Sequence, residues 1–82
     1  MIQQTSLQAY ELLQPKLGAK QQEVLSALRV LKQATDKDLA RFLGWPINTI
    51  TPRRLELERA GLVRERGRVV QNGRTRIVWC LY

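Results

Sequence analysis

Arginine is the side chain with the clearest chemistry in this sequence of 82 residues, and it is concentrated in the second half. Residues 42–82 contain eight arginines, no lysine and three acidic residues, so they carry +5 of the chain's net charge of +7. Guanidinium groups bind phosphates and guanine edges through paired hydrogen bonds. The alternative is a charged surface that only keeps the protein in solution. We favour a polyanionic partner, of which nucleic acid is the commonest.

Residue types that enzymes and metal sites need are scarce. The sequence has no histidine and one cysteine, Cys80, which leaves no Cys/His metal cluster, no intrachain disulfide and no Ser-His or Cys-His pair. The acidic residues are scattered among basic ones, and no glycine-rich phosphate loop is present. Cys80 lies between Trp79 and Leu81 and is expected to be a small strand residue. We therefore expect no catalytic activity, no metal and no cofactor.

The length limits the architecture to one domain with one small core. No apolar run approaches the ~20 residues of a membrane span, and residues 1–6 lack the charged-then-apolar pattern of a signal peptide. We expect a cytoplasmic protein, in a bacterium or an infected host cell, with no membrane partner.

A first helix is predicted over residues 6–14. Thr5 and Gln8 have the spacing of a capping box, and Pro15 ends the helix. A helix this short does not persist alone, so its apolar stripe must pack somewhere. We favour the core of the same chain, and the alternative is the same stripe of a second copy in a homodimer. The stripe consists of Leu7, Tyr10 and Leu13.

Two more helices are predicted before residue 45. The first runs from about 19 to 33 and the second from about 34 to 44. Thr35 and Asp38 have the spacing of a capping box, and Gly44 is a natural left-handed stop. The expected core residues are Val24, Leu25, Ala27, Leu28, Val30 and Leu31 of the first helix and Leu39, Phe42 and Leu43 of the second.

The helix after the Trp45-Pro46 turn has two possible starts. Asn48 could cap it, which would place Pro52 inside the helix and remove a backbone hydrogen bond. Thr51 could cap it instead, with Pro52 in the first helical position, where proline is tolerated. We favour a loose turn from Asn48 that becomes regular helix at Thr51 or Pro52. The expected core anchors are Ile50 and Leu57, and the expected stop is Gly61.

The C-terminal tail predicts a two-stranded antiparallel hairpin. Asn72-Gly73 is the strongest short hairpin signal, and it separates two alternating segments, residues 62–71 and 74–82. A lone hairpin is only marginally stable, so this one must pack on the helices. The returning strand has Ile77, Trp79 and Leu81 on one face and Val78, Cys80 and Tyr82 on the other.

This order of helix, short helix, turn, second short helix and basic hairpin resembles the winged helix-turn-helix family. The resemblance rests on Asp38-Leu39-Ala40, Leu43-Gly44 and the junction Gly61-Leu62-Val63, and it covers residues 19–82. The chain looks most like small stand-alone proteins of phage and prophage genomes. The resemblance implies an α+β, mostly helical fold, with a three-helix core, an extra N-terminal helix and a C-terminal β-hairpin wing. Residues 1–18 would form an arm and residues 19–82 the winged domain.

The resemblance also implies which residues contact double-stranded DNA. The helix after Trp45-Pro46 would enter the major groove, and the wing would contact the backbone or the minor groove. Arg54 departs from the family pattern, because that position is often aliphatic and faces the core. Either its stem lies along the core edge with its head in solvent, or the helix is slightly rotated. The candidate contacts are Asn48, Thr49, Thr51, Arg53 and Arg54 on the helix and Arg66, Arg68, Arg74 and Arg76 on the wing.

The predicted function is that of a DNA-binding protein, a transcriptional regulator of phage type. Asparagine suits adenine and arginine suits guanine in the major groove. The alternatives are a protein-interaction adaptor with the same fold and an RNA-binding module. A net charge of +5 on the half that holds the helix and the wing argues against an adaptor. Phosphate charge alone does not separate DNA from RNA.

Overall fold

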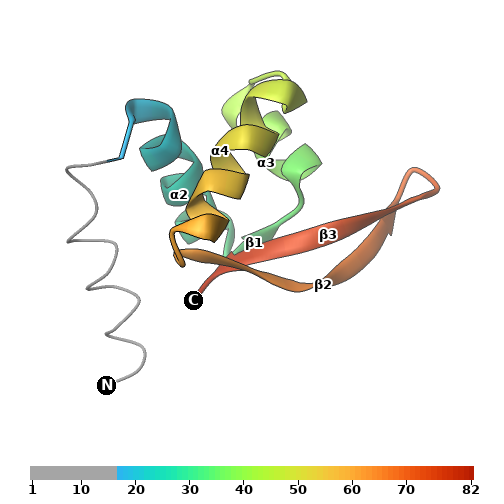
Figure 1. The fold of residues 1–82 in the computed structure, drawn as a ribbon. Helices are drawn as coiled ribbons and strands as arrows, with labels where there is room; N and C mark the ends of the chain where they lie inside the picture. Colours follow the sequence, from blue (N-terminus) through green and yellow to red (C-terminus); the bar gives the residue numbers. More distant parts are fainter. Residues whose placement is uncertain (1–16) are drawn as a thin grey trace.

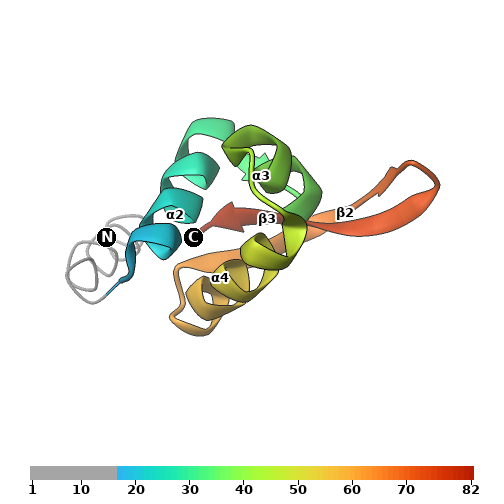
Figure 2. The same ribbon diagram turned by 90° about the horizontal axis from the view of Figure 1, so that it is seen from above.

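A computed structural model describes residues 17–82 as three helices packed on a small antiparallel sheet (Figure 1). The elements in chain order are α2 (Ala19–Leu31), β1 (Gln33–Ala34), α3 (Asp36–Leu43), α4 (Ile47–Arg59), β2 (Val63–Gln71) and β3 (Arg74–Leu81). The tip of the β2–β3 hairpin extends beyond the helices (Figure 2). The helix predicted over residues 6–14, with Leu7, Tyr10 and Leu13, lies outside the described residues.

Helix α2 ends two residues earlier than predicted, because the chain turns into a strand. Lys32 follows the helix with a φ of 74°. Gln33 and Ala34 then pair antiparallel with Cys80 and Trp79, which makes β1 the third strand of the sheet. This strand is not apparent from the sequence, since two residues are too few to show an alternating pattern.

Helix α3 begins and ends as predicted. The Thr35 hydroxyl accepts a hydrogen bond from the Asp38 backbone N–H, and the Asp38 carboxylate accepts one from the Thr35 N–H. Gly44 has a φ of 71°, and the N–H groups of Gly44 and Trp45 both donate to the Ala40 carbonyl. Both ends of this short helix are therefore fixed by local hydrogen bonds.

Helix α4 begins earlier than predicted, and the predicted loose turn is wrong. Pro46 is the N-cap and Ile47 the first helical residue, so neither Asn48 nor Thr51 caps the helix. The extended backbone of Pro46, with φ −62° and ψ 146°, supplies the geometry that an N-cap needs. Pro52 consequently lies inside the helix, where it leaves the Asn48 carbonyl without its usual N–H donor.

The end of α4 leads directly into the hairpin. Gly61 has a φ of 79°, and its N–H donates to the Glu58 carbonyl. The Leu62 N–H donates to the Leu57 carbonyl, which completes the hydrogen bonds of a Schellman cap. Leu62 and Val63 are buried, so β2 starts in the core. The predicted stop at Gly61 is confirmed, and it sets the direction in which the hairpin leaves α4.

The hairpin itself forms as predicted. Asn72 and Gly73 have φ values of 52° and 75°, which is the two-residue turn that matches the twist of the strands. The register shifts between Glu65 and Gly67, so Arg66 lies at a β-bulge, which increases the local twist.

All three helices and all three strands contribute to one hydrophobic core. Val30 and Phe42, both predicted to be in it, are 65% and 49% exposed, so these two predictions are wrong. Both residues instead line an open groove of about 420 Å³ between α2 and α3. The buried apolar core consists of Val24, Leu25, Ala27, Leu28, Ala34, Leu39, Ala40, Ile50, Leu57, Leu62, Val63 and Trp79. None of the helices in residues 17–82 has the length and apolar character needed to cross a membrane.

The position of Pro52 leads to a stability prediction. Pro52→Ala restores the N–H donor to the Asn48 carbonyl and removes a steric conflict, so the free energy of unfolding should rise by about 1–2 kcal/mol. Pro46→Ala is the control, because the N-cap has no intrahelical N–H bond to restore. Urea unfolding measures both, and a gain from Pro46→Ala that equals the gain from Pro52→Ala would contradict this account.

Candidate nucleic-acid interface

Helix α4 has one face in the core and the opposite face in solvent. Ile50 and Leu57 are fully buried and hold the helix in place, as predicted. The opposite side carries residues three, four, seven and eleven positions after Asn48, which is the spacing of one helical face. We call this set the outer face of α4: Asn48, Thr51, Pro52, Leu55 and Arg59. Leu55 is half-buried and the other four are exposed, and Thr49 is half-buried beside them.

Arg54 points away from this outer face and is held inside the protein. Its guanidinium donates to both carboxylate oxygens of Asp36, at 3.0 and 2.9 Å, and to Glu58 at 3.1 Å. The same guanidinium lies over the Trp79 ring, 4.0 Å from the ring centroid. The side chains of Arg54 and Asp36 are only 12% and 15% exposed. Of the two arrangements that the sequence left open, the head of Arg54 in solvent is therefore not the one observed.

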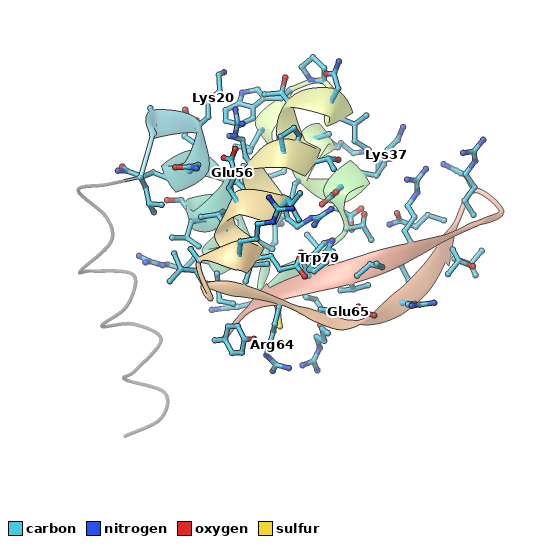
Figure 3. All side chains as sticks on the ribbon, in the orientation of Figure 1. Lys20, Lys37, Glu56, Arg64, Glu65 and Trp79 are labelled. Atoms are coloured by element: carbon cyan, nitrogen blue, oxygen red, sulfur yellow. The ribbon has the colours of Figure 1, made fainter. Side chains whose placement is uncertain are left out.

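Arg53 also has a partner within the protein. Its Nε and Nη2 donate to the two carboxylate oxygens of Glu56, each at 2.8 Å. The Gln21 amide of α2 donates to the same carboxylate. Lys20 of α2 and Glu56 of α4 line one pocket between the two helices (Figure 3). The hydrogen bond from Arg53, helped by the one from Gln21, lowers the pKa of Glu56, and the bond with Glu56 raises the pKa of Arg53. The pair is therefore charged at neutral pH.

The wing is attached to the first turn of α3 by one glutamine. Gln71, the last residue of β2, accepts a hydrogen bond from the Thr35 hydroxyl at 3.0 Å and donates one to the Asp38 carboxylate at 3.0 Å. Thr35 and Asp38 are the two residues of the α3 capping box. These four hydrogen bonds therefore cap α3 and also fix the angle between the wing and the three helices.

The wing presents its arginines to solvent. Arg64, Arg66, Arg68 and Arg74 are exposed, and Arg76 is half-buried. Arg68 makes one long contact with Glu65, 3.5 Å between Nε and the carboxylate, with its side chain 66% exposed. Arg64 lies near the Tyr82 ring, on the face of the sheet turned away from the helices (Figure 3). The exposed positive charge of the second half therefore belongs mainly to the wing.

A cavity of about 290 Å³ separates α4 from the wing. Its lining includes Ile47 and Thr51 of α4 and Thr75 and Arg76 of β3. Within residues 17–82, the Nε of Arg76 is a buried donor without a hydrogen-bond partner. A buried donor without an acceptor costs about 1–3 kcal/mol. In the same residues, no group of three or more metal-ligating side chains is placed to hold an ion.

Sequence reasoning missed three residues of this region. Arg59 belongs to the outer face of α4, and its spacing of eleven residues from Asn48 could have shown it. Asp36 suits a helix start, but its sequence position does not indicate a partner, and Gln71 carries no signal at all. The partners of Asp36 lie 15 and 18 residues away in the sequence and those of Gln71 lie 33 and 36 residues away, and local patterns do not predict such contacts.

The geometry described above is shared with solved structures. No protein-family model matches the sequence, and a search of curated proteins gives no match. The structure is similar to that of a mutant MarR from E. coli, with a TM-score of 0.68 and 23% identity over 98% of this chain and 58% of that one. It is also similar to AbfR in its disulfide-formed state, with a TM-score of 0.70 and 25% identity over 99% of this chain and 56% of that one.

The fold is a winged helix-turn-helix. Helices α3 and α4 form the helix-turn-helix, and the β2–β3 hairpin forms the wing. The predicted α+β class and the predicted three-helix core with a C-terminal wing are confirmed. The chain spans less than two thirds of the length of either neighbour.

The Arg54–Asp36 pair should be essential for stability. Arg54→Ala leaves a mostly buried carboxylate without its main partner, so the free energy of unfolding should fall by about 3 kcal/mol or more. Arg53→Ala is the matched control, because its pair with Glu56 is 32% and 40% exposed and should matter much less. Chemical denaturation measures both variants. Equal losses would show that Arg54 has no special structural role.

Gln71 should control the mobility of the wing. Gln71→Ala leaves the buried Thr35 hydroxyl without its acceptor, so stability should fall by about 1–2 kcal/mol. Amide exchange near the wing turn, residues 69–76, should accelerate more than exchange in α2. Gln33→Ala, an exposed strand residue, is the control. Unchanged exchange in the wing would mean that the glutamine does not hold it.

Proposed function

We propose that this protein binds double-stranded DNA with a sequence preference and regulates transcription, with α4 in the major groove and the wing on the backbone or in the minor groove. The observation that carries the proposal is the pairing of two surfaces. The outer face of α4 has no acidic residue, and the neighbouring hairpin carries four exposed arginines against one acidic residue, Glu65. A helix of this kind fits the major groove, and arginines neutralise phosphates.

The contacts in this proposal divide between the two surfaces. Asn48, Thr49 and Thr51 lie in the first turns of α4, the part of a recognition helix that reaches base edges. The wing contacts are Arg66, Arg68, Arg74 and Arg76. Arg76 also lines the cavity between α4 and the wing. In this proposal Arg53 and Arg54 do not contact DNA, and their ion pairs hold α4 in position.

Two alternatives are less consistent with this arrangement. The major groove of A-form RNA is deep and narrow, so a helix such as α4 cannot enter it. An adaptor surface has no need of a wing on which arginines outnumber acidic residues so strongly. Resemblance to phage and prophage proteins remains a prediction from the sequence, as does a homodimer through Leu7, Tyr10 and Leu13.

Selection from a random duplex library tests the proposal. The purified chain should enrich a consensus sequence, and it should bind the selected duplex more tightly than an RNA duplex of the same sequence. Equal binding to the RNA duplex would favour an RNA-binding module. Failure to bind any duplex at low salt would overturn the proposal.

The wing should supply affinity that does not depend on sequence. Replacement of both Arg68 and Arg74 by Ala should weaken binding to selected and random duplexes alike. The slope of log affinity against log salt should become shallower by about 1 for each phosphate that the variant no longer neutralises.

Arg64→Ala is the matched control for the wing. It removes one arginine at the base of the hairpin, on the face turned away from the helices, and should change the slope less. A salt slope unaffected by the double replacement would leave the wing with a structural role only.

A further inference from the structure

The outer face of α4 is chemically unusual for a helix that reads DNA, because it combines a single amide with apolar groups. Asn48 has no hydrogen-bond partner for its side chain among residues 17–82. Around it lie Pro52, which is exposed, and Leu55, which is half-buried. Ile47, at the edge of this face, is 39% exposed although isoleucine is usually buried.

The two arginines in the middle of α4 are both engaged in ion pairs within the protein. Recognition of guanine needs two guanidinium donors directed at its O6 and N7. Arg53 already uses two donors on Glu56, and Arg54 uses three on Asp36 and Glu58. Both side chains also leave the helix on sides other than the outer face. A guanine contact would therefore require an existing ion pair to break.

Arg59 does not fill this gap. It lies on the outer face but eleven residues after Asn48, which corresponds to roughly 16 Å along the helix. The residues that reach base edges are those of the first turns, so Arg59 is placed to contact the backbone.

The hydroxyl of Thr51 is also engaged. It donates to the Asp36 carboxylate at 3.0 Å, although the residue is exposed. Thr51 therefore has no hydroxyl proton to offer to a base while this bond is intact. Its methyl group adds to the apolar character of the outer face.

We infer that α4 selects A·T base pairs, with Asn48 hydrogen-bonded to adenine and the apolar side chains in contact with thymine methyl groups. This inference rests on the proposed function and names the class of site that α4 reads. Adenine offers an acceptor and a donor that match the asparagine amide, and thymine is the base with a methyl group in the major groove. The wing, with arginines suited to a narrow minor groove, is compatible with the same class of sequence.

The test replaces single thymines of the library-selected duplex by deoxyuridine. This change removes the 5-methyl group from the major groove and leaves the minor groove and the phosphates unchanged. Each thymine in contact with α4 should cost roughly three- to fourfold in affinity, the effect expected for one buried methyl group. Asn48→Ala should weaken binding roughly tenfold and relax the preference at one A·T pair.

Matched variants test whether Ile47, at the edge of the outer face, makes one of these contacts. In Ile47→Ala the cost of deoxyuridine should disappear at one thymine, whereas Val30→Ala, which changes an exposed residue of α2, should leave the cost unchanged. Arg53→Ala should retain the wild-type consensus sequence, because that side chain reads no base.

The outcomes separate this inference from the proposed function. A consensus rich in G·C, or tolerance of deoxyuridine at every position, overturns the A·T inference but leaves the proposed function intact. Binding with no consensus overturns the inference and also the sequence preference of the proposed function. A loss of the consensus in Arg53→Ala, with stability retained, overturns it as well. Failure of the wild-type protein to bind any duplex overturns both.

Discussion

The arrangement of this domain depends on one ion pair, between Arg54 of α4 and Asp36 of α3. The guanidinium holds both oxygens of the carboxylate and lies over Trp79 of β3, so three elements meet at one side chain. Both charged groups are mostly excluded from water, and such a pair is costly unless its geometry is good and its remaining hydrogen bonds are satisfied. Glu58 and Thr51 supply further hydrogen bonds. The result is a defined rotation of α4 about its axis, which decides which residues face outward.

The first turn of α3 connects both parts of the proposed DNA-binding surface. Asp36 holds α4, and Asp38, two residues further on, holds the wing through Gln71. A helix and a hairpin that must contact DNA together need a fixed relative position, because a small error in angle would separate one of them from the duplex. The α3 helix is only eight residues long, and Gln71 is hydrogen-bonded to Thr35 and Asp38, the two residues of its capping box. Its role is therefore to set that position, although it contributes none of the proposed contacts.

Features set by local chemistry could be predicted from the sequence, and features set by distant partners could not. The turn at Asn72-Gly73, the capping box of Thr35 and Asp38 and the stop at Gly61 each depend on neighbouring residues, and all three are observed. The start of α4 was misplaced because Asn48 and Thr51 are better caps by residue preference, whereas the extended backbone of Pro46 provides the geometry.

Burial and pairing were harder to predict than the helices themselves. A helical stripe shows which side of a helix is apolar, but it does not show how much of that side a neighbour covers. Val30 and Phe42 therefore belong to apolar stripes and still lie exposed along the α2–α3 groove. For the candidate site, the wing arginines could be located by their positions beside the turn. The orientation of Arg53 and Arg54 depends on Glu56 and Asp36, and only the three-dimensional structure brings Arg54 to Asp36.

A count of charges treats the eight arginines of the second half as equivalent, and the structure shows that they are not. Those at positions 53 and 54 neutralise carboxylates within the protein, while Arg59 and four of the five on the wing are exposed to solvent. Energy from phosphate neutralisation is then available mainly through the wing, and it does not depend on sequence. In the proposed function, selection among sequences is left to the few uncharged side chains on the outer face of α4, because contacts between uncharged groups and base edges release few counterions and depend little on salt. In this proposal the contribution of the wing to DNA affinity depends on ionic strength, and the contribution of α4 depends on base identity.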